Sequence, residues 1–136
     1  MAARDYAPMI VRLSVGIVFL LLGVDQVIHT DVWTGYLPEW FINLLPAWQT
    51  PESFMYANGV FDSIIGLLLL LGVFTRLIAV LATVHLTGVV IALGYNEIAI
   101  RDIGILLSAL AVAFFGSDRW CLERQWQRRI VKDVNN

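Results

Sequence analysis

The sequence predicts an all-α membrane protein, a bundle of four antiparallel helices that cross the lipid bilayer. Of its 136 residues, 59% are hydrophobic and 15% are charged, whereas an average soluble domain is about 45 to 50% apolar and about 25% charged. Four apolar segments of near-spanning length carry most of this excess, and IIGLLLLLGVF at residues 64–74 is apolar all round a helix. This composition argues against a soluble or disordered chain and predicts one membrane domain over residues 1–136.

The first predicted spanning helix covers residues 7–28, close to the about 20 residues that cross about 30 Å of hydrocarbon. Arg4 and Arg12 near its start resemble the basic region of a signal peptide, but no A-x-A cleavage pattern follows the apolar run. We therefore expect this helix to be retained. One of its faces carries small residues that would let another helix approach closely; this face comprises Arg12, Gly16, Phe19, Gly23 and Gln26.

An aromatic loop is expected at residues 29–53. Its apolar side chains fall near helical spacing between two prolines that limit any helix, which predicts a short amphipathic segment in the membrane interface. The alternative is a lid over the bundle. These side chains are Trp33, Leu37, Trp40, Phe41 and Leu44.

Three further spanning helices are expected at residues 54–74, 76–95 and 102–116, the last of them short enough to require an upright orientation. Residues 117–136 should form a basic amphipathic tail. Leu122, Trp126 and Ile130 recur at intervals of four among basic residues, which favours a helix lying on anionic lipid. A helix that docks on another protein is the competing interpretation.

Basic residues predict the orientation, because short loops rich in Lys and Arg stay in the cytoplasm. All but one of the nine Lys and Arg fall on the side of the two termini, and the exception is Arg101. Both termini should therefore be cytoplasmic, with residues 29–53 and 96–101 facing outward. The expected location is the cytoplasmic (inner) membrane of a prokaryote, crossed several times.

Two ionisable residues are expected near the middle of the bilayer. Asp62 lies about 12 Å and His85 about 14 Å inside their helices, counted from opposite ends. Because the two helices are antiparallel neighbours, the carboxylate and the imidazole could reach hydrogen-bonding distance. Such a pair is either a structural contact that fixes the bundle or a site for a proton or a quinol head group.

Further polar residues extend this pair toward the outer rim and complete a candidate polar pocket. Asn58 shares a helix face with Asp62, and Arg101 is expected to pair with an acidic neighbour. Asp25 points away from Gln26 and is expected at the headgroup level without a buried partner. The full set is Gln26, Asn58, Asp62, His85, Asn96, Glu97, Arg101 and Asp102.

Several function classes lack their signatures in this sequence. Cys121 is the single cysteine, which excludes a disulfide framework, and isolated His29 and His85 make a weak case for a metal. No nucleotide loop, nucleophile elbow or haem motif is present. A net charge of −2 does not suggest a nucleic acid partner. The expected partners are the lipid bilayer and other membrane subunits or further copies of the chain.

The order of three segments resembles the DoxX family of small four-helix membrane proteins: VRLSVGIVFLLLGVDQ, YANGVFDSIIGLLLLLGVFTRLIAVL and GYNEIAIRDIGILLSALAVAFFG, with W-x-x-Y-x-P-x-W in the loop between the first two. The resemblance extends from Arg12 to Gly116. The matching polar positions are Arg12, Asp25, Asp62, Arg76, Asn96, Glu97, Arg101 and Asp102. Many relatives have a lysine where this chain has Gln26, and often a glutamate where it has Asp62.

The resemblance implies a membrane subunit, because some relatives are described as subunits of thiosulfate:quinone oxidoreductase or of other membrane redox assemblies. The first hypothesis is therefore an accessory or quinone-facing subunit in which Asp62, His85 and Arg101 bind a quinone-like head group. A non-catalytic assembly subunit is the second hypothesis. A small-solute or proton pathway is the third. No cofactor other than a quinone is suggested.

Overall fold

A computed structural model describes residues 6–134 and confirms the predicted all-α fold. Four helices are long and apolar enough to cross a membrane: α1 (Ala7–Ile28), α4 (Pro51–Leu71), α5 (Thr75–Leu93) and α6 (Glu97–Phe115). Two short helices, α2 (Thr30–Thr34) and α3 (Glu39–Ile42), lie in the loop between α1 and α4, and α7 (Leu122–Val134) follows the bundle. Arg4, which contributed to the predicted orientation, lies outside the described residues.

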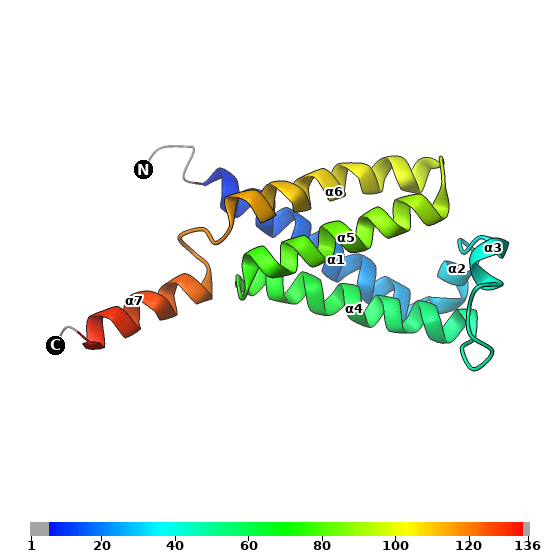
Figure 1. The fold of residues 1–136 in the computed structure, drawn as a ribbon, viewed down its shortest axis with the longest axis horizontal. Helices are drawn as coiled ribbons and strands as arrows, with labels where there is room; N and C mark the ends of the chain where they lie inside the picture. The colour runs from blue at the N-terminus through cyan, green and yellow to red at the C-terminus, as the bar shows by residue number, and fades with distance from the viewer. Residues whose placement is uncertain (1–5, 135–136) are drawn as a thin grey trace.

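The bundle has two distinct ends (Figure 1). The loop end carries α2 and α3 together with the start of α4 and of α6. The terminus end carries the start of α1, the end of α6 and the departing α7. Within the bundle α1 packs mainly on α4 and α5 mainly on α6, while α1 and α6 join the two pairs. From the turn that connects them, α4 and α5 separate toward the loop end.

Glycines bring α1 and α4 into backbone contact. Gly23 faces Gly59, and Gly16 faces Gly66, so the two helices run antiparallel along a line of four glycines that we call the glycine seam. A Cβ atom built on Gly66 would lie 2.4 Å from the backbone nitrogen of Leu20. Larger residues at these positions would therefore force the helices apart.

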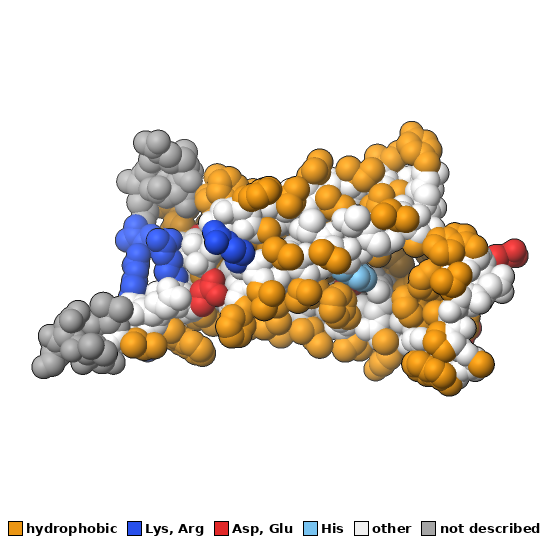
Figure 2. Space-filling model, viewed as in Figure 1, with side chains coloured by type: hydrophobic (Ala, Val, Ile, Leu, Met, Phe, Trp, Pro, Cys, Tyr) orange, Lys and Arg blue, Asp and Glu red, His pale blue; other side chains and the backbone are white. Residues whose placement is uncertain are grey.

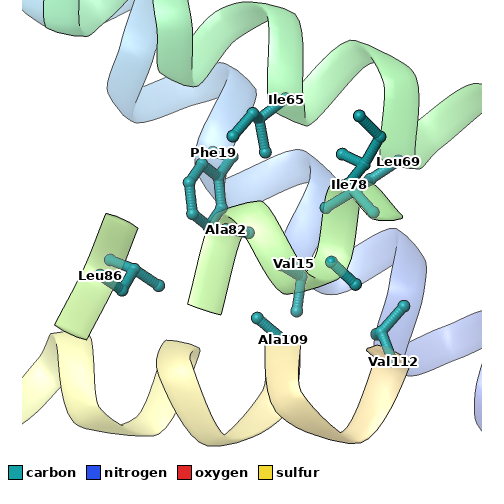
Figure 3. Close-up of a cluster of buried hydrophobic side chains, with 10 residues drawn as sticks. Val15, Phe19, Ile65, Leu69, Ile78, Ala82, Leu86, Ala109 and Val112 are labelled. Atoms are coloured by element: carbon teal, nitrogen blue, oxygen red, sulfur yellow. The ribbon is translucent and has the colours of Figure 1, made fainter. Parts of the chain in front are cut away.

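The hydrophobic core lies between the four long helices, and each of them contributes to it (Figure 3). Phe19 from α1, Ile65 from α4 and Ala82 from α5 are nearly inaccessible to solvent. On the outside, Leu21, Val84 and Leu107 are more than half exposed. Outward-facing leucines and valines on long apolar helices are what contact with lipid tails requires.

Two helices begin earlier than the sequence suggested. The last spanning helix was predicted at residues 102–116, but α6 begins at Glu97, because the Asn96 side chain accepts a hydrogen bond from the Ala99 N–H and caps it. Similarly, α4 begins at Pro51 instead of residue 54, because Thr50 and Ser53 form a reciprocal capping box. The fourth spanning helix is therefore 19 residues long and not short.

Candidate functional site

A cavity of about 280 Å³ lies toward the loop end of the bundle, between all four long helices and the loop that covers that end. Its walls are mainly hydrocarbon and aromatic rings. The long helices contribute Phe19 and Leu22, Met55, Leu86 and Val89, and Ile98 and Ile105 among others. A binding site for an apolar molecule has this kind of lining, with a few polar groups placed within it.

The loop between α1 and α4 forms one wall of the cavity. Its contributions are Trp33, Tyr36, Leu37, Pro38 and Phe41. Other aromatic side chains of the same loop point away from the bundle, and Trp48 is 81% exposed. One set of rings in this loop therefore covers the cavity, while Trp48 is left exposed.

Trp33 is held in place by Asp25. The Trp33 indole nitrogen donates a hydrogen bond to Asp25 Oδ2 at 2.7 Å, and His29 Nδ1 lies 2.8 Å from Asp25 Oδ1. Both oxygens of this half-exposed carboxylate are thus used. As expected, Asp25 has no buried partner, since His29 is exposed and Trp33 is only partly buried. The contact with Trp33 arises because α2 follows directly on the last turn of α1.

A hydrogen-bond cluster from α1 and α4 forms the polar part of the cavity. Gln26 Nε2 donates to Asp62 Oδ2 at 3.1 Å, and Asn58 Nδ2 donates to the same oxygen at 3.3 Å. Asn58 also donates to Gln26 Oε1 at 2.7 Å, so the two amides orient each other. Asp62 is 6% exposed. One oxygen of this buried carboxyl group therefore has two amide donors.

The other oxygen of Asp62 faces His85. His85 Nε2 lies 3.1 Å from Asp62 Oδ1, but the two atoms do not form a hydrogen bond. Among the described residues no group donates a hydrogen bond to this buried oxygen. The His85 ring packs edge-on against Phe61 at a centroid distance of 5.1 Å, and 19% of its side chain remains exposed. The structure thus brings Asp62 and His85 together and leaves one buried acceptor open.

Arg101 and Asp102 form a second polar group on the opposite wall. The Arg101 Nε donates to Asp102 Oδ1 at 2.8 Å, so Arg101 does pair with an acidic neighbour. The Asp102 side chain is nearly buried, whereas that of Arg101 is 43% exposed. Both residues line the cavity.

Six of the eight residues in the predicted polar pocket line this cavity: Gln26, Asn58, Asp62, His85, Arg101 and Asp102. Asn96 and Glu97 do not. Asn96 is occupied as the cap of α6, where it also donates to the Leu93 carbonyl, and Glu97 lies in the first turn of that helix. Asn96 and Glu97 are therefore polar because they lie at the start of a helix, not because they face the cavity.

Sequence reasoning missed the most buried ion pair, which lies at the terminus end. Arg12 Nε donates to Asp118 Oδ2 at 2.6 Å, and both side chains are 3% exposed. Arg12 Nη1 also donates to the carbonyls of Leu69 and Leu70 at 2.6 and 3.0 Å, in the last turn of α4. One guanidinium therefore joins α1, α4 and the segment between α6 and α7.

The environment of Asp118 favours its charged form. Burial opposes ionisation of this carboxyl group, but the hydrogen bonds from Arg12 and from the Trp120 backbone N–H outweigh it and lower the pKa of Asp118. Trp120 in turn stacks on Tyr6 at a centroid distance of 5.2 Å. This arrangement fixes the segment between α6 and α7 against the start of α1.

The same segment also contacts the turn between α4 and α5. The hydroxyl of Thr75 donates to the Cys121 sulfur at 3.4 Å, and the Glu123 N–H donates to the Gly72 carbonyl at 3.2 Å. Burial raises the pKa of the Cys121 thiol, which is fully inaccessible. Cys121 is therefore a packing residue with low reactivity, and α7 begins at a fixed place on the bundle.

Metal-binding chemistry has no obvious place among the described residues. No group of three or more His, Cys, Asp or Glu side chains there could hold a metal ion. The polar groups of the residues that line the cavity are two amides, two carboxyl groups, one imidazole, one guanidinium, the Tyr36 hydroxyl and the Trp33 indole N–H. Together they can donate hydrogen bonds to, and accept them from, an uncharged polar ring.

Comparison with known proteins agrees with the resemblance seen in the sequence. The chain is 27% identical over 137 aligned positions, 88% of its own length and 80% of the other's, to the uncharacterized membrane protein Rv3486 of Mycobacterium tuberculosis. No solved structure matches the chain. The sequence model of the DoxX family matches residues 7–95, which contain the glycine seam, the covering loop and the Asp62–His85 pair. The chain therefore belongs to the DoxX family of integral membrane proteins.

Proposed function

We propose that this protein binds the ring of a quinone-type molecule in the cavity at the loop end, as an accessory or quinone-facing subunit of a membrane redox system. The observation that carries the proposal is the buried Asp62 Oδ1, which lines the cavity, lies beside His85 and accepts no hydrogen bond from the described residues. A buried acceptor without a donor costs free energy, so a ligand that supplies the donor is favoured there.

The chemistry of the cavity suits both redox forms of such a ring. The hydroxyl group of a quinol can donate a hydrogen bond to Asp62 Oδ1, and the carbonyl group of a quinone can accept one from the His85 imidazole or from Arg101. Aromatic and aliphatic walls would cover the faces of the ring. Gln26 supplies an amide donor to Asp62 where many relatives carry a lysine, so the ligand would meet an amide, not a cation, at this position.

The test is a binding measurement on the purified protein. Lipid extracts of protein isolated in mild detergent should contain quinone, and titration with a short-chain quinone should quench the fluorescence of Trp33 and saturate. Asp62→Asn and His85→Ala should each weaken binding about tenfold, the size of one lost hydrogen bond. The control Glu52→Gln alters an exposed residue that does not line the cavity and should bind like the wild type.

The result that overturns the proposal is equally specific. Extracts without quinone together with no saturable quenching by the wild type would show that the cavity does not hold this ring. Equal affinity of the wild type and of both cavity variants would lead to the same conclusion.

A second candidate function, a non-catalytic assembly subunit, is favoured by α7. Trp126 and Ile130 lie one turn apart on this helix, and each is 63% exposed. A photoreactive amino acid at Trp126 should then crosslink to one defined partner subunit, while Asp62→Asn lowers thermal stability without a metabolic defect. Crosslinks to lipid alone would exclude this candidate and support a helix that lies on the membrane surface.

We also propose that the terminus end faces the cytoplasm of a prokaryotic cell. Arginine side chains gather at that end of the molecule, whereas the face of the bundle seen in this view is mainly hydrophobic (Figure 2). Basic residues at one end of a spanning bundle favour its cytoplasmic placement. The cavity would then open toward the outer half of the membrane.

A further inference from the structure

A second hollow, of about 150 Å³, lies on the outside of the bundle between α1 and α6. We call it the α1–α6 groove. It shares Val18, Arg101 and Ile105 with the cavity, so these three side chains separate the two hollows and belong to the walls of both. The groove therefore adjoins the candidate ligand site, and the side chains that the two share lie between them.

Apart from Arg101, the polar side chains of the groove are the two serines Ser14 and Ser108. The Ser14 hydroxyl donates to the Val11 carbonyl at 3.1 Å, and the Ser108 hydroxyl donates to the Gly104 carbonyl at 2.9 Å. Both hydroxyls are thus satisfied within their own helices. Gly104 adds open space, because a Cβ atom built there would have no neighbour within 4 Å. Small residues with satisfied hydroxyls leave room for hydrocarbon.

Arg101 stands at the junction of the two hollows. Only its Nε is engaged, in the hydrogen bond to Asp102, and its terminal nitrogens make no hydrogen bond to the described residues. A guanidinium that is 43% exposed on a helix within a membrane needs polar partners. One such polar partner would be a ring oxygen of a bound ligand, at the edge of the ring that carries a hydrocarbon chain.

We propose that the α1–α6 groove holds the apolar chain of a lipid-soluble quinone whose ring lies in the cavity, and that such a ligand enters sideways from the bilayer past Arg101. This inference rests on the proposed function and adds to it the class of ligand, a ring with a long hydrocarbon chain. The loop covers the end of the cavity, whereas the groove opens on the flank where lipid tails lie.

Two glycine variants separate the groove from the cavity. Gly88 lines the cavity and Gly104 lines the groove. In both places an added Cβ atom has no neighbour within 4 Å, so we expect Gly88→Leu and Gly104→Leu to fold. Each variant is titrated with two quinones that share the same ring, one without a chain and one with a ten-carbon chain. Circular dichroism and thermal unfolding verify that the variants are folded.

We expect Gly104→Leu to weaken binding of the chain-bearing quinone about tenfold, the effect of losing contact with about two methylene groups, and to leave the chain-free quinone unaffected. Gly88→Leu should weaken binding of both. If Gly104→Leu affects both quinones equally or neither of them, the groove does not hold the chain. If the wild type binds neither quinone, or Gly88→Leu changes nothing, the proposed function itself fails and this inference fails with it.

Discussion

Replacing Asp118 by asparagine removes the charge that faces Arg12 and should lower the stability of the whole bundle. The carboxylate accepts hydrogen bonds from Arg12 Nε at 2.6 Å and Nη2 at 3.3 Å, and from the Trp120 N–H at 2.9 Å. Breaking a buried ion pair on one side costs about 3 to 5 kcal/mol, because a charge is left without compensation.

The lower part of that range applies to Asp118→Asn. Arg12 keeps the carbonyls of Leu69 and Leu70 as acceptors, and asparagine can still accept from Trp120. We therefore expect a loss of about 3 kcal/mol, which corresponds to a fall in Tm of about 12 °C for a chain of this size. Thermal unfolding in mild detergent, followed by circular dichroism at pH 7, measures this difference.

Two comparisons make the result decisive. Asp31→Asn removes an exposed carboxylate on α2 and should change stability by no more than about 0.5 kcal/mol. Arg12→Met combined with Asp118→Asn should cost clearly less than the sum of the two single changes, because the residues act as a pair. A Tm for Asp118→Asn within about 2 °C of the wild type, or strictly additive costs, would refute the role assigned to this pair.

Four further predictions concern packing, pH, thiol reactivity and orientation. Gly66→Ala places a Cβ atom 2.4 Å from the Leu20 nitrogen and should lower stability by about 1 to 3 kcal/mol in the same unfolding assay. The control Gly104→Ala should be neutral or slightly stabilising, and equal effects of the two changes would contradict the close contact at the glycine seam. Because the pKa of Asp118 is lowered in the folded protein, its stabilising effect is complete above about pH 3.9 and is lost as the pH falls further through the folded-state pKa. In that acidic range Tm should fall more steeply for the wild type than for Asp118→Asn. Parallel curves of Tm against pH would show that Asp118 is not responsible. Cys121 should react with iodoacetamide at pH 8 at least about 100-fold more slowly in the folded protein than in sodium dodecyl sulfate, and similar rates would mean that the segment before α7 is open. In a Cys121→Ser background, a membrane-impermeant maleimide should label Trp48→Cys in intact cells. It should label Gln127→Cys only after the cells are permeabilised, and the reverse pattern would show that the orientation is opposite to the proposed one.

Much of the fold was predictable because a bilayer imposes simple rules on length and polarity. Spanning helices follow from apolar runs, and the depth of Asp62 and His85 follows from counting 1.5 Å per residue. Since these two residues lie on helices joined by a tight turn, their proximity needed no knowledge of the rest of the bundle. The glycine-lined face of α1 was likewise visible in the sequence.

The remaining features depend on contacts that pattern reasoning does not reach. Arg12 and Asp118 are 106 residues apart, and Arg12 resembled a flanking charge of the kind that marks the cytoplasmic side. Glu97 and Arg101 looked like parts of a polar loop, although the Asn96 cap places both inside α6. The cavity wall made by Trp33 depends on the fold of α2 over α1, which the aromatic spacing did not specify.

The glycine seam divides the molecule mechanically. Because the backbones of α1 and α4 are in contact along the seam, these two helices can hardly slide or tilt against each other, and they behave as one rigid unit. The α5–α6 hairpin has no such restraint near the cavity, where Gly88 and Gly104 have free space beside them. We therefore expect any widening of the cavity for a bulky ligand to come from motion of α5 and α6 relative to the α1–α4 pair.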